Sequence, residues 1–148
     1  MQADESPPIE CLLVEDNPAD VRLLREVLKG SNVRCRLHVV GDGEEAMEFL
    51  QRRGKYNDAP TPDIILLDLN LPKKDGREVL GEVKKDIGLR FIPIIVLTTS
   101  QARDDIVRCY NDHANCYITK PLGFDQFDAL VKLIEEFWLR TVKLPRRD

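Results

Sequence analysis

Short apolar runs alternate along the chain with longer segments in which apolar residues recur every three or four positions. In one such segment Val79, Leu80, Val83 and Ile87 share one face, a pattern typical of an amphipathic helix. The apolar runs predict strands over residues 9–15, 36–40, 63–68, 92–97 and 115–119. Strands that alternate with helices are joined by right-handed crossovers. We therefore expect an α/β fold with a doubly wound, five-stranded parallel sheet and five helices.

Size and composition agree with one such domain. The chain has 148 residues, a net charge of −4 and four cysteines, none in CxxC spacing. We expect an N-terminal tail over residues 1–8, a folded domain over 9–140 and a C-terminal tail over 141–148. Free buried thiols and no binding to nucleic acid are expected. The first residues are acidic, and no apolar run reaches the ~20 residues of a membrane span, so we expect no membrane association and a cytoplasmic location.

The run at residues 63–68 is apolar on both alternating faces and ends in an aspartate. Such a strand is buried on both sides, as in a parallel sheet covered by helices. Asp68 would then lie at the carboxyl edge of the sheet, where ligands bind in open α/β folds. Because aspartate is also common in turns, Asp68 is either a solvated strand-end residue or the centre of the chemistry.

Polar residues also follow three of the other predicted strands. Glu15 ends the first strand and Asp16 follows it, Thr98 follows the fourth strand and Lys120 follows the fifth. Because parallel strands end at one edge of a sheet, we expect these side chains to lie close to Asp68. Carboxylates that lie close together repel one another, and a hard divalent cation such as Mg²⁺ relieves that repulsion.

This set of side chains is suited to accepting a phosphoryl group. Asp68 can attack phosphorus and form an acyl phosphate, while Mg²⁺ and Lys120 neutralise charge on the equatorial oxygens. Each residue alone has an ordinary explanation: Lys120 as a surface lysine, and Asp16 with Asn17 and Pro18 as the start of a helix. Their joint pattern, in this order along the chain, favours the functional interpretation.

From about residue 9 to residue 137 the chain resembles the receiver domains of two-component response regulators. The matching motifs are VEDNP with its acidic pair, DLNLPKKDG around Asp68, TTS after the fourth strand and YITKP after the fifth. The resemblance implies a flavodoxin-like receiver fold with strand order 2-1-3-4-5. It also implies that a phosphohistidine on a partner histidine kinase phosphorylates Asp68.

For Mg²⁺, the resemblance implies a defined set of ligands. Asp16 and Asp68 would bind through carboxylates, Glu15 through water and Asn70 through its backbone carbonyl. Glu15 stands where aspartate is common in the family, a change that lengthens one reach to the metal.

For the response to phosphorylation, the resemblance implies three further roles. Thr98 matches the switch hydroxyl, Tyr117 the switch aromatic residue and Lys120 the phosphate-binding lysine. Pro121 matches a position whose preceding peptide bond is usually cis, a geometry that is costly for any residue but proline.

We therefore expect a single-domain response regulator that signals by altered protein binding, and no enzyme beyond self-phosphorylation and slow self-dephosphorylation. The chain ends soon after the last predicted helix, so no output domain is expected. The long loop at 51–63 and the tail IEEFWLRTVKLP resemble the small response regulators of phytochrome-type histidine kinases. The sequence does not identify the downstream protein. Two alternatives stay open: a Mg²⁺-dependent aspartyl-phosphate phosphatase, in which Asn70 would replace a second aspartate, and a pseudo-receiver that binds without chemistry.

The last predicted helix is apolar over more than one face. Leu133, Phe137, Trp138 and Leu139 either extend the core under the tail or form a dimer or partner surface. We expect a homodimer through these residues, because isologous dimers are the commonest oligomers.

Overall fold

The computed structural model describes residues 7–146, so parts of both predicted tails lie outside the described residues. The centre of the molecule is one sheet of five parallel strands in the order β2-β1-β3-β4-β5. The strands are β1 (Ile9–Val14), β2 (Cys35–Val40), β3 (Ile64–Leu67), β4 (Ile94–Thr98) and β5 (Cys116–Thr119). The helices are α1 (Pro18–Lys29), α2 (Gly43–Gln51), η1 (Gly54–Tyr56), α3 (Gly76–Lys85), α4 (Arg103–Asn111), α5 (Phe124–Ile134) and η2 (Glu135–Thr141). The predicted fold and strand order are confirmed.

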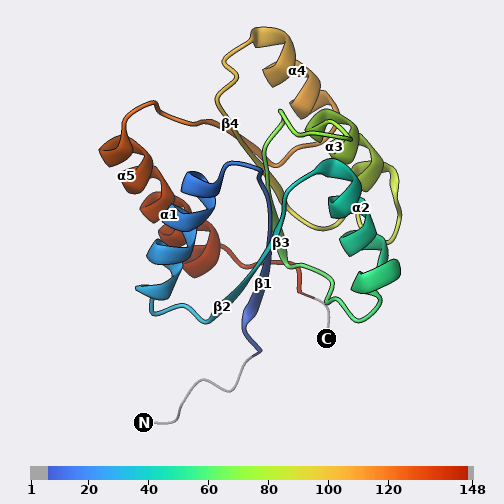
Figure 1. Cartoon of the computed structure of the whole chain (residues 1–148), viewed down its shortest axis with the longest axis horizontal. Coiled ribbons are helices and arrows are strands. Elements are labelled where there is room, and N and C mark those ends of the chain that lie inside the picture. The colour runs from blue at the N-terminus through green and yellow to red at the C-terminus, as the bar shows by residue number, and fades with distance from the viewer. Residues whose placement is uncertain (1–6, 147–148) are drawn as a thin grey trace.

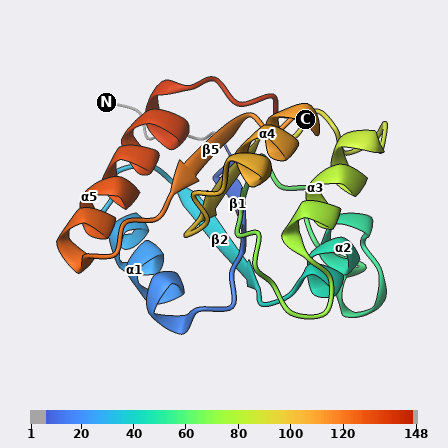
Figure 2. The same ribbon diagram turned by 90° about the horizontal axis from the view of Figure 1, so that it is seen from above.

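Helices cover both faces of this sheet. Figures 1 and 2 show α1 and α5 together on one face and α2 and α3 on the other. The side chains of β3 alternate between two cores: Ile64 and Leu66 pack with α1 and α5, and Ile65 and Leu67 pack with α2 and α3. All four are at most 3% exposed, as expected of a strand covered on both sides. None of the described helices has both the length and the apolar character to cross a membrane.

Side-chain caps begin the helices that follow β1 and β3. The Asn17 side chain accepts hydrogen bonds from the backbone N–H groups of Ala19 and Asp20, at 2.9 and 3.3 Å, and Pro18 occupies the first turn. The cap of α1 is therefore Asn17, and the carboxylate of Asp16 takes no part in it. Asp75 caps α3 in the same way, by accepting from the backbone N–H of residue 77 at 2.7 Å.

Gly76, the first residue of α3, lies directly against the backbone at the end of β3. A Cβ atom at Gly76 would lie 2.1 Å from the carbonyl oxygen of Asp68 and 2.7 Å from Cα of Leu69. The N–H of Gly76 donates to the Leu69 carbonyl at 2.9 Å. The start of α3 is thus fixed against Asp68 by a close approach that only glycine allows.

The C-terminal end of α5 continues into the π-helix η2, which changes the register of its side chains. Hydrogen bonds in a π-helix join residues five apart, so Leu139 follows Ile134 on the buried face. Leu139 is only 8% exposed and Trp138 packs against the same core, whereas Leu133 and Phe137 are 61% and 54% exposed. The prediction that Leu139 belongs to an exposed dimer surface was therefore wrong. The prediction assumed the 3.6-residue period of an α-helix, whereas the wider turn of the π-helix places Leu139 on the buried face.

Beyond η2 the chain returns to the amino edge of the sheet and contacts the start of β1. Nη2 of Arg146 donates to the carbonyl oxygens of Pro7 and Pro8 at 2.7 and 2.8 Å. Its Nε lies 3.4 Å from Oδ2 of Asp63, which also accepts from the N–H of Glu10 at 2.8 Å. These contacts join both ends of the described chain to the residues that begin β1 and β3.

The peptide bond before Pro121 differs from the expectation. No cis peptide bond is present among residues 7–146, so the Lys120–Pro121 bond is trans. The prediction of a cis bond was wrong for this structure. The trans form is favoured for an X–Pro bond by about 0.5–1 kcal/mol when the surroundings do not impose the other isomer.

Candidate functional site

Three acidic residues lie together where β1 and β3 end. These strands are neighbours in the sheet, with Val14 opposite Leu67, so the residues that follow them are adjacent. Glu15 and Asp68 are buried, at 3% and 8% exposure, and Asp16 is exposed. One carboxylate oxygen from each of the three lies within 4.8 Å of the others.

Lys120 reaches this cluster from the end of β5. Its Nζ donates to Glu15, to Oδ2 of Asp20 at 2.9 Å and to Oδ2 of Asp68 at 3.3 Å. Its side chain is 5% exposed, so these carboxylates replace water around the ammonium group. The structure thus brings together the lysine and the acids that the sequence pattern predicted at this edge.

Asp20 is a member of the site that the sequence reasoning missed. It lies in the first turn of α1, where acidic residues are common because they favour the positive end of the helix dipole. Nothing in its spacing distinguishes it from such a residue. Only the contact with Lys120 in the folded chain gives Asp20 a place in the site.

The cluster carries more negative charge than one lysine offsets. Burial raises the pKa of Glu15 to about 7, although the hydrogen bond from Lys120 acts in the opposite direction. Burial lowers the pKa of Lys120, but hydrogen bonds to Glu15 and Asp20 and the charge of Asp68 outweigh this effect, so its pKa is raised. The ammonium group therefore stays charged, and a further cation would stabilise the ionised form of the carboxylates.

The donor atoms at this edge fit a hard divalent cation. All three are carboxylate oxygens, the ligand type that Mg²⁺ prefers, and none is nitrogen or sulfur. Oxygens bound to one Mg²⁺ at about 2.1 Å lie about 3–4 Å apart, which small side-chain rotations in this group would give. Asn70 lies beside them in the loop after β3 and is exposed. The residues present therefore suit the predicted cofactor.

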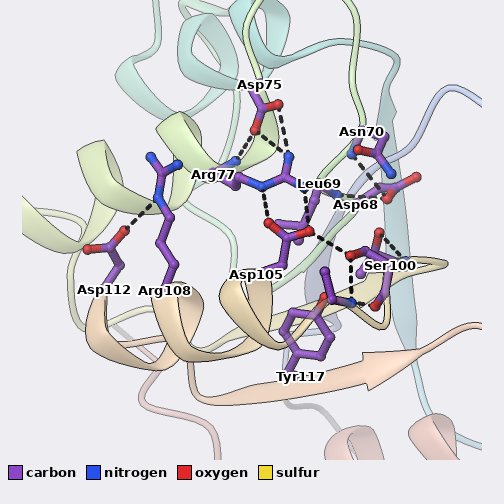
Figure 3. Close-up of polar contacts among 12 residues, drawn as sticks. Asp68, Leu69, Asn70, Asp75, Arg77, Ser100, Asp105, Arg108, Asp112 and Tyr117 are labelled. Atoms are coloured by element: carbon purple, nitrogen blue, oxygen red, sulfur yellow. Dashed lines mark hydrogen bonds and ion pairs between the residues drawn. The ribbon is translucent and has the colours of Figure 1, made fainter.

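The carboxylate of Asp68 is held in one orientation. Oδ1 accepts from the backbone N–H groups of Leu69 at 2.7 Å and Asn70 at 3.4 Å, as Figure 3 shows. Oδ2 accepts from Lys120 at 3.3 Å. Both oxygens thus accept hydrogen bonds, so the carboxylate is oriented at the edge of the sheet, with 8% of the residue exposed.

The two predicted switch residues meet at Ser100, in the loop between β4 and α4. Thr98 is fully buried at the end of β4, and its Oγ1 accepts from the N–H of Ser100 at 3.4 Å. The hydroxyl of Tyr117, on β5, donates to the carbonyl oxygen of Ser100 at 2.9 Å (Figure 3). The Tyr117 ring packs against the core on the α2 and α3 side. A displacement of this loop would therefore change the hydrogen bonds of both Thr98 and Tyr117.

A parallel sheet of order 2-1-3-4-5, with an acidic cluster, a buried threonine and a lysine at its carboxyl edge, defines a receiver domain. The chain belongs to the response regulator receiver domain family, whose model matches residues 11–132.

One relative and two crystal structures show which kind of response regulator this chain is similar to. Response regulator Rcp1 from Synechocystis sp. (strain ATCC 27184 / PCC 6803 / Kazusa) is 51% identical over 145 residues, which cover 98% of this chain and 99% of Rcp1. The crystal structure of the Mn²⁺-bound form of Rcp1 has a TM-score of 0.93 and 52% identity, and the match covers 94% of this chain and 100% of that one. The crystal structure of the phosphorylated cyanobacterial phytochrome response regulator RcpA has a TM-score of 0.92 and 53% identity, with 95% and 100% covered. The predicted resemblance to small phytochrome response regulators is confirmed.

Proposed function

We propose that this receiver accepts a phosphoryl group on Asp68 from a histidine kinase and signals through altered binding to other proteins. The observation that carries the proposal is the oriented Asp68 carboxylate, 8% exposed, with Nζ of Lys120 at 3.3 Å. In the transfer, a carboxylate oxygen of Asp68 forms a bond to phosphorus as the bond from phosphorus to the kinase imidazole breaks. The product is an acyl phosphate. Beyond slow hydrolysis of its own acyl phosphate, no catalytic turnover is proposed.

The proposed cofactor is Mg²⁺. Asp16 and Asp68 would hold it through carboxylates, Glu15 through water and Asn70 through its backbone carbonyl. When bound, the ion supplies positive charge that offsets the charge of the phosphoryl oxygens. The Mn²⁺ in the Rcp1 crystal structure supports this assignment, because Mn²⁺ and Mg²⁺ favour the same oxygen ligands.

Three residues of this chain would respond to the phosphoryl group. Lys120, already 3.3 Å from Asp68, would donate to a phosphoryl oxygen. The hydroxyl of Thr98, which accepts from the Ser100 amide, would donate its own hydrogen to another phosphoryl oxygen. Because Tyr117 is bound to the same loop, the change at Thr98 would alter the population of Tyr117 positions and the protein surface around them.

The proposed partner is a histidine kinase of the phytochrome type, in the cytoplasm. The identity of 53% to the cyanobacterial phytochrome response regulator RcpA supports this class of kinase. A homodimer is proposed through the exposed side chains of Leu133, in α5, and Phe137, in η2. Sedimentation at about 100 μM tests the dimer, since a micromolar Kd would leave little monomer at that concentration. A monomer there would reject it.

Replacement of Asp68 tests the acceptor directly. Asp68→Asn should abolish Mg²⁺-dependent incorporation of phosphate from acetyl phosphate and leave the fold intact, because it removes one nucleophilic oxygen at the edge of the sheet. Asp58→Asn is a matched control, since Asp58 is an exposed aspartate in the loop before β3. That control should be phosphorylated like the wild type. Phosphorylation of Asp68→Asn at the wild-type rate would contradict the assignment.

A further inference from the structure

The C-terminal half of helix α4 contacts the body of the protein through the buried Cys109 and a hydrogen bond from the Tyr117 N–H to the Tyr110 hydroxyl, while its N-terminal end is held by polar contacts. Cys109 is its one buried residue among those described, and its N-cap, Ala102, forms no side-chain hydrogen bond. A helix with so little buried apolar surface and no cap is free to shift unless other interactions hold its first turn.

The first turn of α4 is held by an arginine from α3. Nε and Nη2 of Arg77 donate to the two carboxylate oxygens of Asp105 at 2.6 and 2.8 Å, a bidentate pair that fixes direction as well as distance. Nη1 of Arg77 also donates to both oxygens of Asp75, each at 3.0 Å. Figure 3 shows the guanidinium between the two carboxylates. Arg77 and a hydrogen bond from Ser100 lower the pKa of Asp105 to about 2, so the pair stays ionised above the acid range.

On one side, this ion pair is connected to the switch loop. The hydroxyl of Ser100 donates to Oδ2 of Asp105 at 2.6 Å. Ser100 is also the residue whose carbonyl oxygen accepts from Tyr117 and whose N–H donates to Thr98. The position of Asp105 therefore determines where Ser100 presents these groups.

On the other side, the same ion pair is connected to the acceptor. Arg77 directly follows Gly76, whose Cα lies against the backbone of Asp68 with no room for a Cβ. Asp75 caps α3 and binds the Arg77 side chain as well. The start of the Arg77 side chain is thus fixed relative to Asp68. The ion pair with Asp105 then fixes the first turn of α4 relative to Arg77.

We propose that Arg77 is a positioning residue of the switch: its ion pair with Asp105 holds Ser100 where both Thr98 and Tyr117 reach it. The arrangement that receives the phosphoryl group is then already populated before phosphorylation. The inference depends on Asp68 being the acceptor, as proposed above. Without the ion pair, the Ser100 loop samples other positions. The apparent affinity for a phosphoryl group or its mimic then falls in proportion to the fraction of molecules in which the Ser100 loop keeps the binding-competent position.

Titration with beryllofluoride and Mg²⁺, followed by ¹H–¹⁵N NMR of the full chain, tests this role. Arg77→Gln should weaken beryllofluoride binding at least about threefold and displace the Ser100 and Tyr117 amide signals in the free protein. The affinity of Arg77→Lys should lie between those of Arg77→Gln and the wild type, because lysine keeps the positive charge but cannot form the bidentate pair with Asp105. Arg108→Gln is the matched control. It removes the same charge from a contact at the C-terminal end of α4, where Nε of Arg108 lies 3.9 Å from Asp112, and should leave the affinity unchanged.

The outcomes separate this inference from the proposed function. If the wild type binds beryllofluoride but Asp68→Asn does not, the acceptor stands; unchanged or tighter binding by Arg77→Gln then overturns the role of Arg77 alone. If the wild type does not respond, or Asp68→Asn responds equally, the proposed function fails and the inference fails with it. If Arg77→Gln unfolds at too low a temperature for the titration, Ser100→Ala is the second variant, because it removes the hydrogen bond to Asp105 and leaves the ion pair in place. Ser100→Ala should still weaken binding about twofold, and unchanged binding would overturn the proposal.

Discussion

A pair of glycine substitutions in α3 tests whether the helix is as tightly fixed to the acceptor as the structure indicates. Gly76 and Gly81 belong to the same helix but have opposite surroundings. A Cβ at Gly76 would lie 2.1 Å from the carbonyl oxygen of Asp68, whereas at Gly81 the nearest atom is a carboxylate oxygen of Asp112 at 3.9 Å. The first distance requires the backbone to move, and the second is an ordinary contact.

The two substitutions should therefore change stability in opposite directions. Gly76→Ala should lower the free energy of unfolding by about 1–3 kcal/mol, the range for overpacking that displaces backbone. Gly81→Ala should raise it by about 0.5–1 kcal/mol, because alanine loses less backbone entropy in a helix interior. For a chain of this size each kcal/mol corresponds to a shift in Tm of about 2–4 °C, so thermal melting followed by circular dichroism resolves the pair.

The same pair should also differ in chemistry. The backbone displacement in Gly76→Ala reaches Asp68 directly and should slow phosphorylation by acetyl phosphate, while Gly81→Ala should react at the wild-type rate. If Gly76→Ala melted at or above the temperature of the wild type and was phosphorylated normally, α3 would not be fixed to the acceptor. Arg77 would then not be fixed relative to Asp68 through Gly76.

Two further predictions concern the last helix and the ion pair. In urea denaturation of the monomer, Leu139→Ala should lower the free energy of unfolding by about 2–3 kcal/mol and Phe137→Ala by less than about 1 kcal/mol, because only the loss of the Leu139 side chain leaves a cavity. Equal losses would contradict the burial of Leu139 against the core. Arg77→Gln should destabilise the protein less at pH 2 than at pH 6. The pKa of Asp105 is lowered from 3.8 to about 2 in the folded state, so the stability from the pair is present above pH 3.8 and is lost as the pH falls toward 2; a loss independent of pH would show that Arg77 acts through packing.

The alternation of strands and helices followed from the apolar pattern, which is clearest at the centre of the sheet. Every residue of β3 and β4 is buried, whereas β2 contains Arg36 and His38 and only its last residue, Val40, is buried. The strand order 2-1-3-4-5 was expected from the resemblance to receiver domains and not from periodicity. The acidic pair, Asp68, Thr98 and Lys120 were also predicted to meet, because parallel strands end at one edge. Whether each performs its expected role is what the experiments above test.

Features that depend on contacts distant in sequence could not be predicted in this way. Asp20 and Asp105 are both acids in the first turn of a helix, and the sequence alone does not show that one faces Lys120 and the other Arg77. Leu139 was misplaced because a π-helix has no clear signature in apolar spacing. The isomer before Pro121 depends on a free-energy difference of about 0.5–1 kcal/mol, too small for sequence to decide.

The contact of Arg146 with Pro7 and Pro8 bears on how such a module can be joined to others. It holds the two ends of the described chain together at the edge of the sheet opposite Asp68. A polypeptide fused near either end would start on the far side from the reacting carboxylate and leave the approach to it open. The same closeness should allow residues 7 and 146 to be joined by a short linker, with new ends opened in the loop between η1 and β3. A circular permutant of this kind would keep the order of the sheet and the acceptor edge.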